Sequence, residues 1–451
     1  YQQNPIARAA SAKSSTTLYL PLTFHLVGYS NGSGYPDLHA VLNAFCRVNQ
    51  DYANTNIQFY IQFPINYIDN SVLNTHDSVY QGGALMAQYK VPNTTNCYFV
   101  TNPAGACGYN VLYGGLTVSR NCLGRNTYSH ELGHALGLQH TFFGWEGGQS
   151  YNGTSQAGFN DPAPDFVLYD YTMFKDTFWG PDTIIVDTAE VEKVARTGPQ
   201  SNCYTAADGF CDTPADYIAF GWNCNINGLG SIRQLDPDSM VFYSDGANIM
   251  SYSRCRAVFS TEQGNGMRAF AQANRSSHIG RTPSSDTIAA QPINFRSPAN
   301  SAVLTGTTGH TFRWNAVPNA THYLVRICQA PCNLSNQVLE DVVVTDTFYT
   351  TNANLPPRAA FLPYRWRVTP FNESYTCTAP SSYYIFNTQI ATNTSLLPEG
   401  TLQCTVAPNP SQAGQPLYLS AQSVAPASIN LALYSIAGQV IQTQQWNITA
   451  G

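Results

Sequence analysis

The sequence carries little charge. Only 11% of its residues are Asp, Glu, Lys or Arg, against about a quarter in an average globular protein. The formal net charge is −6, and the 21 Lys and Arg residues form no basic run. A nucleic-acid partner and an anchor on an anionic membrane surface are therefore not expected. The sequence also lacks a run of 18 apolar residues, so no membrane span is expected.

The residues given also show no signal-peptide pattern. The chain begins at Tyr1 without an initiator Met, a charged segment or an apolar segment, so we expect a processed or excised secreted polypeptide. Its twelve Cys residues lack the paired spacing of structural zinc modules. They favour disulfides in an oxidising compartment, with buried free thiols as the alternative. With 451 residues, 43% of them hydrophobic, the chain is long enough for two or three folded domains.

The first part of the chain combines strand and helix patterns. Alternating apolar and β-branched residues predict strands, and apolar residues at helical spacing predict helices that pack on them. The strands are expected at 16–28 and 57–63, and the helices at 38–53, 126–138 and 261–275. Pro, Ser and Gly accumulate at 280–292, as they do in linkers. The first domain is therefore expected to span residues 1–285.

The later part of the chain contains short alternating strands. They predict an antiparallel sandwich at 286–390 and a β-rich block at 391–451, so the fold class is α+β followed by all-β domains. Trp314, Tyr364 and Trp366 make the sandwich resemble a fibronectin type III-like domain. The last block resembles the first part of the C-terminal sorting domain of proteins exported by the type IX secretion system. That resemblance implies the secretion machinery as a partner.

One eleven-residue segment suggests chemistry. His130 and His134 are four residues apart on a predicted helix, so their rings share one face, and Glu131 lies beside them. Gly137 permits a sharp turn out of the helix that would bring His140 to the same point. Three histidines, a carboxylate and an open position are what a catalytic zinc site requires. The alternative, that these histidines are ordinary core residues, conflicts with three of nine His falling in eleven residues.

A second segment lies downstream. Asn248 to Tyr252 resembles the Met-turn of metzincins, in which a Met passes beneath the zinc histidines and a Tyr two residues later approaches the metal. Met250 and Tyr252 fit that spacing, although Met is also a common core filler.

With these motifs, residues 16–275 resemble the pappalysin family of metzincin metallopeptidases. The resemblance rests on the zinc motif followed by His140-Thr141-Phe142, on Asp208 to Asp216, and on the Met-turn with Cys255 and Phe259 after it. It implies a metzincin catalytic domain, with a twisted mixed sheet, a long zinc helix, an irregular lower subdomain and a substrate cleft between the two subdomains. It also assigns Tyr252 a hydrogen bond to the tetrahedral oxyanion.

The resemblance further suggests a structural calcium ion. Its oxygen donors would be Asp208, the carbonyl of Phe210, and Thr213, since Ca²⁺ prefers hard oxygen ligands. The alternative is that these residues only form turns. The resemblance also implies two disulfides among four cysteines around the lower cleft, but the sequence leaves three pairings open. These are Cys203, Cys211, Cys224 and Cys255.

Two features depart from the family pattern. An acidic insertion at 143–202, with nine acidic and three basic residues, would form either a lid or cleft wall, or a solvated surface loop. Relatives that prefer a basic residue after the scissile bond carry acidic residues after the Met-turn. Here the chain reads Ser253-Arg254-Cys255-Arg256, so a preference for cleavage before Arg or Lys is not expected.

The leading hypothesis is a secreted zinc endopeptidase of a bacterium, extracellular or attached to the cell surface. Zinc held by His130, His134 and His140 would activate a bound water, and Glu131 would act as the general base on protein or peptide substrates. One alternative is a catalytically inactive surface adhesin or binding protein built on a metzincin scaffold. Another is a zinc amidase that acts on cell-wall peptides.

Overall fold

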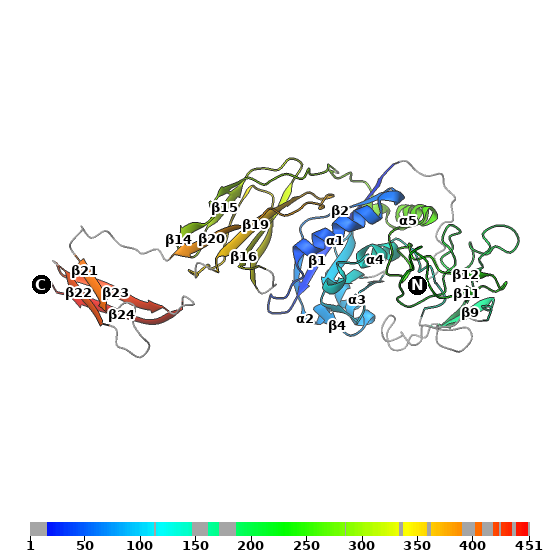
Figure 1. The fold of residues 1–451 in the computed structure, drawn as a ribbon, viewed down its shortest axis with the longest axis horizontal. Coiled ribbons are helices and arrows are strands. Elements are labelled where there is room, and N and C mark those ends of the chain that lie inside the picture. Colours follow the sequence, from blue (N-terminus) through cyan, green and yellow to red (C-terminus); the bar gives the residue numbers. More distant parts are fainter. Residues whose placement is uncertain are drawn as a thin grey trace. The chain divides into compact units, whose positions relative to one another are not determined.

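The computed structural model shows a mixed α+β protein with more strand than helix (Figure 1). It describes residues 16–111, 114–146, 161–170, 186–284, 286–332, 337–358, 362–389, 402–407, 418–423, 425–434 and 439–449. The chain divides into two compact units. The first contains Tyr1–Ala290, Pro318–His322 and Pro370–Ala379, and the second contains Gln291–Val317, Tyr323–Thr369 and Pro380–Gly451.

A mixed sheet forms the centre of the first unit. Its order is β2-β1-β5-β8-β7, with β3 pairing the far end of β1. The pairings of β1 with β2, β3 and β5 and of β5 with β8 are parallel, and β7 runs antiparallel to β8. Ten of the eleven residues of β1 and all six of β5 are buried, because strands of a parallel sheet are covered on both faces. The strands are β1 (Leu18–Gly28), β2 (Ile57–Ile61), β3 (Asn66–Asp69), β5 (Thr95–Val100), β7 (Gly108–Val111) and β8 (Gly115–Ser119).

Three helices matter for the site. Helix α1 (Leu38–Asp51) begins at Asp37, whose carboxylate accepts a bond from the Ala40 N–H, and its apolar side is buried. Helix α5 (Thr261–Asn274) begins with a capping box between Ser260 and Gln263. Helix α4 (Thr127–Ala135) carries the histidine motif and is buried along its whole length. The long helix expected there is thus only nine residues long, because the chain turns at Gly137. The other elements of this region are α2 (Ser71–Asn74), α3 (Val79–Gln88), β4 (Thr75–His76) and β6 (Asn102–Pro103).

The described residues between α4 and α5 are mostly irregular. They contain two small hairpins, β9 (Phe166–Asp170) with β10 (Val186–Glu190), and β11 (Gln234–Leu235) with β12 (Val241–Phe242). Part of the acidic insertion lies outside the described residues. In the described part, Val167 and Ala189 join a buried cluster with Phe142, Trp145 and Tyr217. This part of the insertion therefore packs against the segment that follows the histidine motif.

Five disulfides form among the described residues. Cys203–Cys211 and Cys224–Cys255 resolve the pairing that the sequence left open, and Cys97 is a buried free thiol. The sandwich contains three cysteines, Cys328, Cys332 and Cys377, so one of them is left without a partner there. Cys377 bonds Cys46 of helix α1, 331 residues away. Composition cannot reveal such a distant partner. The other pairs are Cys107–Cys122 and Cys328–Cys332.

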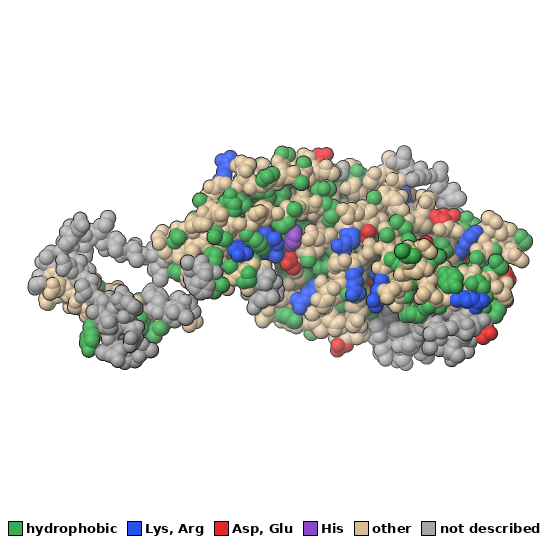
Figure 2. All heavy atoms as spheres, in the orientation of Figure 1, with side chains coloured by type: hydrophobic (Ala, Val, Ile, Leu, Met, Phe, Trp, Pro, Cys, Tyr) green, Lys and Arg blue, Asp and Glu red, His purple; other side chains and the backbone are tan. Residues whose placement is uncertain are grey.

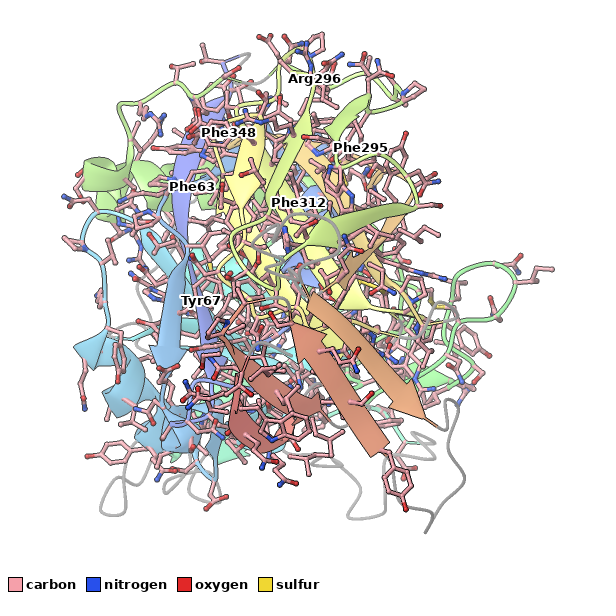
Figure 3. All side chains as sticks on the ribbon, turned by 90° about the vertical axis from the view of Figure 1, so that its left-hand side faces the viewer. Phe63, Tyr67, Phe295, Arg296, Phe312 and Phe348 are labelled. Carbon is pink, nitrogen blue, oxygen red and sulfur yellow. A yellow bond between two sulfur atoms is a disulfide. The ribbon has the colours of Figure 1, made fainter. Side chains whose placement is uncertain are left out.

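The second unit contains two facing sheets. One has the order β13-β15-β18 and the other the order β14-β20-β19-β16-β17. Large aromatic rings fill the space between them: Phe295 and Phe312 (Figure 3) lie 4.2 and 4.9 Å from the Trp366 ring. One expectation is wrong, because β14 pairs β20 in parallel. The strands are β13 (Phe295–Ser297), β14 (Ala302–Thr305), β15 (Thr311–Trp314), β16 (His322–Gln329), β17 (Val338–Val344), β18 (Phe348–Thr350), β19 (Tyr364–Phe371) and β20 (Tyr384–Gln389).

The described residues of the tail form two antiparallel strand pairs, so the expected β-rich block is present. They are β21 (Leu402–Ala407) with β22 (Tyr418–Ser423), and β23 (Ala427–Tyr434) with β24 (Val440–Ile448). Within the part of the chain that the structure describes, no helix is long and apolar enough to cross a bilayer. On the face drawn in Figure 2, Lys and Arg side chains are scattered among neutral atoms and form no continuous basic patch.

Candidate metal centre

Helix α4 places two imidazole rings side by side. His130 and His134 are four residues apart and both are buried, so they project from the same face of the helix. Each ring contacts a backbone carbonyl through Nδ1: His130 at 2.8 Å from Ile249 O, and His134 at 2.9 Å from Leu138 O. Because a carbonyl only accepts hydrogen bonds, each Nδ1 carries the proton and each Nε2 is left with a free lone pair.

The third ring arrives through a turn after the helix. Gly137 has φ +87°, a left-handed conformation that residues with a Cβ adopt only with strain. The turn is closed by bonds from the Gly137 N–H to His134 O and from the Leu138 N–H to Gly133 O, both 3.0 Å. It brings His140 Nε2 to 3.1 Å from His134 Nε2.

The three Nε2 atoms converge on one point. His134 Nε2 also lies 3.1 Å from His130 Nε2, and among the described residues these three form the one group of His, Cys, Asp or Glu side chains able to share an ion. Tetrahedral zinc bonds of about 2.0–2.1 Å would separate ligand nitrogens by about 3.3 Å. Three unprotonated nitrogens facing each other repel unless a cation lies between them, so the donor set fits zinc.

Burial also keeps these rings neutral. It lowers the pKa of His134 and of His140 to about 3, and it lowers the pKa of His130 well below its ordinary value. Neutral imidazole is the form that binds a transition metal.

Glu131 follows His130 on helix α4, and its carboxyl has no hydrogen-bond partner among the described residues. Its side chain packs against Gly108 of β7, where an added Cβ would lie 3.1 Å from Glu131 Oε1. Burial raises the pKa of Glu131 to about 8, and the Arg256 guanidinium opposes this shift. A carboxylate with a pKa near neutrality can both accept and return a proton.

The Met-turn residues lie against the histidines. Met250 is fully buried, and an added Cβ at Gly133 of α4 would lie 2.5 Å from its Sδ. The Tyr252 ring is 37% exposed and its centroid is 4.9 Å from that of His140. Burial, with the nearby carboxyls of Glu131 and Glu146, raises the pKa of Tyr252, so its hydroxyl is protonated and able to donate a hydrogen bond.

Two residues at this site were missed by sequence reasoning. Glu146 lies 3.1 Å from His140 Nδ1 through Oε1, and Arg256 Nη1 lies 3.3 Å from His130 Nδ1. Neither is at a spacing that a helix or strand would predict. Arg254, which is closer to the Met-turn in sequence, is exposed. For Glu146, the one indication in the sequence was its position six residues after His140.

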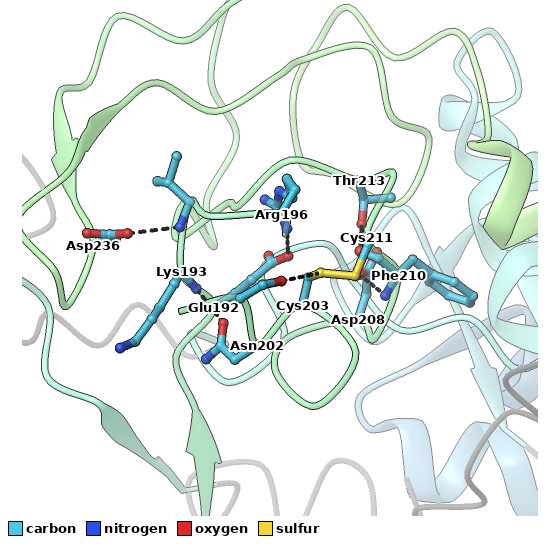
Figure 4. Close-up of polar contacts among 12 residues, drawn as sticks. Glu192, Lys193, Arg196, Asn202, Cys203, Asp208, Phe210, Cys211, Thr213 and Asp236 are labelled. Atoms are coloured by element: carbon cyan, nitrogen blue, oxygen red, sulfur yellow. Dashed lines mark hydrogen bonds and ion pairs between the residues drawn. A yellow bond between two sulfur atoms is a disulfide. The ribbon is translucent and has the colours of Figure 1, made fainter. Parts of the chain in front are cut away.

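The candidate calcium residues come together elsewhere in the unit (Figure 4). Thr213 Oγ1 lies 2.9 Å from Asp208 Oδ1 and 2.8 Å from the carbonyl of Phe210, beside the Cys203–Cys211 disulfide. Asp208 and Thr213 are buried, and burial raises the pKa of Asp208 to about 7. The Thr213 hydroxyl therefore links the other two oxygens through hydrogen bonds. Ca²⁺ takes six to eight oxygen ligands, so these three would form only part of its shell.

No family model matches this chain, and no curated protein matches it. Among solved structures, it is similar to the fibronectin(III)-like modules of CbhA from Clostridium thermocellum. The identity is 6% and the TM-score 0.16, over 35% of this chain and 79% of that chain. So low a TM-score carries no argument about fold or function.

Proposed function

We propose that this protein is a secreted zinc-dependent endopeptidase of the metzincin type, with His130, His134 and His140 as the zinc ligands. The observation that carries the proposal is the convergence of three Nε2 atoms, each in a ring whose Nδ1 faces an oxygen atom. A bound zinc ion supplies a Lewis acid that activates water and polarises a peptide carbonyl.

The chain's own residues would carry the protons. Glu131 removes a proton from the attacking water and later returns it to the leaving amine. Its buried, unpartnered carboxyl suits this task because nothing in the described residues competes for it. Tyr252 donates a hydrogen bond to the oxyanion that develops on the carbonyl, and its protonated hydroxyl and partial exposure support that role.

The remaining assignments belong to the same proposal. The chain is exported by a bacterium through the type IX secretion machinery, which recognises the tail at 391–451. Its substrates are proteins or peptides. The sandwich at 286–390 is a fibronectin type III-like spacer, and the first domain ends near residue 285. Asp208, Phe210 and Thr213 contribute to a structural calcium site.

The test is digestion of a denatured protein mixture by the purified chain, with and without a zinc chelator, and identification of every cut by mass spectrometry. We expect chelator-sensitive cuts by the wild type and by an Asp77→Ala control, whose exposed carboxylate is remote from the motif in sequence. Glu131→Ala should bind zinc and cut nothing. An active Glu131→Ala protein would refute the mechanism, and a zinc-loaded wild type without cuts would favour the inactive binding protein.

A further inference from the structure

The three histidines differ in what lies behind each ring. The Nδ1 atoms of His130 and His134 face the backbone carbonyls of Ile249 and Leu138. His140 Nδ1 instead faces a carboxylate, Glu146 Oε1, at 3.1 Å. Among the three ligand rings, His140 is therefore the one whose Nδ1 faces a carboxylate.

Glu146 is held firmly. Its Oε2 accepts a 2.7 Å bond from the Gly144 N–H, and its side chain is only 10% exposed. The segment between His140 and Glu146 is fixed by the buried rings of Phe142 and Trp145. No Lys or Arg among the described residues forms an ion pair with Glu146. Burying a carboxylate without a cation costs folding free energy unless a neighbouring group forms a hydrogen bond with it.

His140 is the ring that most needs support. His130 and His134 take their orientation from helix α4, whereas His140 follows the irregular turn at Gly137. Phe142 stacks on its ring at 4.6 Å and 12°, which restrains the plane of the ring. Stacking leaves open which nitrogen faces the metal. A hydrogen bond from Nδ1–H to Glu146 settles that choice and leaves the lone pair of Nε2 free.

We propose that Glu146 is a positioning residue for the metal centre: it holds His140 in the Nδ1–H tautomer and strengthens the binding of the divalent cation by that ring. The inference rests on the proposed zinc site. Outer carboxylates of this kind orient metal-bound imidazoles and make them better ligands, and their loss typically weakens metal binding by about 10–100-fold.

The experiment measures the affinity of the purified full chain for zinc alone, by competition with a chromophoric chelator. Glu146→Ala removes both hydrogen bonds, and Glu146→Gln keeps an acceptor for the Nδ1–H without the charge. Asp161→Asn removes the same charge at an exposed position. We expect Glu146→Ala to bind zinc about 10–100-fold more weakly, Glu146→Gln to recover part of that loss, and Asp161→Asn to match the wild type.

Two further measurements separate positioning from a merely structural role. The melting temperature of the zinc-free protein should change little in Glu146→Gln, and the visible spectrum of the cobalt-loaded protein should change because one ligand has reoriented. Wild-type zinc affinity and an unchanged cobalt spectrum in both Glu146 variants would overturn the inference and leave the proposed function standing. Failure of the wild type to bind zinc would overturn both.

Discussion

The turn at Gly137 gives the sharpest test of how the third histidine is placed. Gly137 has φ +87°, and an added Cβ would lie 2.5 Å from Cδ2 of Phe270 on α5. Gly198 has nearly the same φ, +84°, but an added Cβ there meets nothing within 4 Å. The two Gly→Ala substitutions therefore share the backbone strain and differ in the clash.

The expected magnitudes come from these two contributions. Left-handed backbone with a Cβ costs about 1–2 kcal/mol, so Gly198→Ala should lower the free energy of unfolding by about that amount. Gly137→Ala adds overpacking against Phe270, which costs about 1–3 kcal/mol more. Because His140 comes three residues after the turn, Gly137→Ala should also weaken zinc binding, whereas Gly198→Ala should not.

The assay is urea unfolding of the zinc-free chain, and then zinc titration of each variant. Equal destabilisation by the two substitutions would show that Phe270 moves aside freely. Unchanged zinc affinity in Gly137→Ala would show that the turn does not position His140. Either result would refute the reasoning.

Other predictions concern single contacts. Replacing both Cys46 and Cys377 by Ala opens a loop of 331 residues and should lower the free energy of unfolding by about 5 kcal/mol. Calorimetry should show a lower melting temperature, and an unchanged melting temperature would contradict the pairing. Burial lowers the pKa of His25 to about 4, so its neutral form contributes about 3 kcal/mol above pH 6.5, which is lost as the pH falls from 6.5 toward 4. In urea unfolding, the difference in free energy of unfolding between the wild type and His25→Asn should narrow over that range. A constant difference would count against this contribution of His25. Gly133→Ala should be destabilising through its 2.5 Å approach to Met250 Sδ, and its cost should shrink in a Met250→Ala background; additive costs in a double-mutant cycle would show that the two do not touch.

The parts of the site that sequence could predict are local. The four-residue spacing of His130 and His134 lies on one helix, and Gly137 marks the turn after it, so both can be read from a few neighbouring residues. Glu146 lies on an irregular turn fixed by buried aromatic rings rather than by a repeating geometry. No helical or strand spacing in the sequence therefore predicts its contact with His140.

The parts of the fold that sequence could predict are also local. Helical spacing in α1 comes from the burial of one side of the helix, whereas β1 is covered on both faces and is predicted by its apolar and β-branched residues. The parallel pairing of β14 with β20 and the bond between Cys46 and Cys377 join residues that are distant along the chain. Such pairings depend on how whole elements pack, which no short window of sequence contains.

The disulfide at Cys377 has a consequence for biosynthesis. The segment 370–379 belongs to the first unit, where Thr376 Oγ1 donates to Leu42 O and Ile61 N–H donates to Glu373 O. A chain is synthesised from its amino end, so the disulfide partner of helix α1 is made more than 300 residues after the helix itself. Until the segment 370–379 has been synthesised, the unit that bears the three histidines lacks part of its structure. A nascent or prematurely terminated chain would thus possess the whole histidine motif before its scaffold is closed.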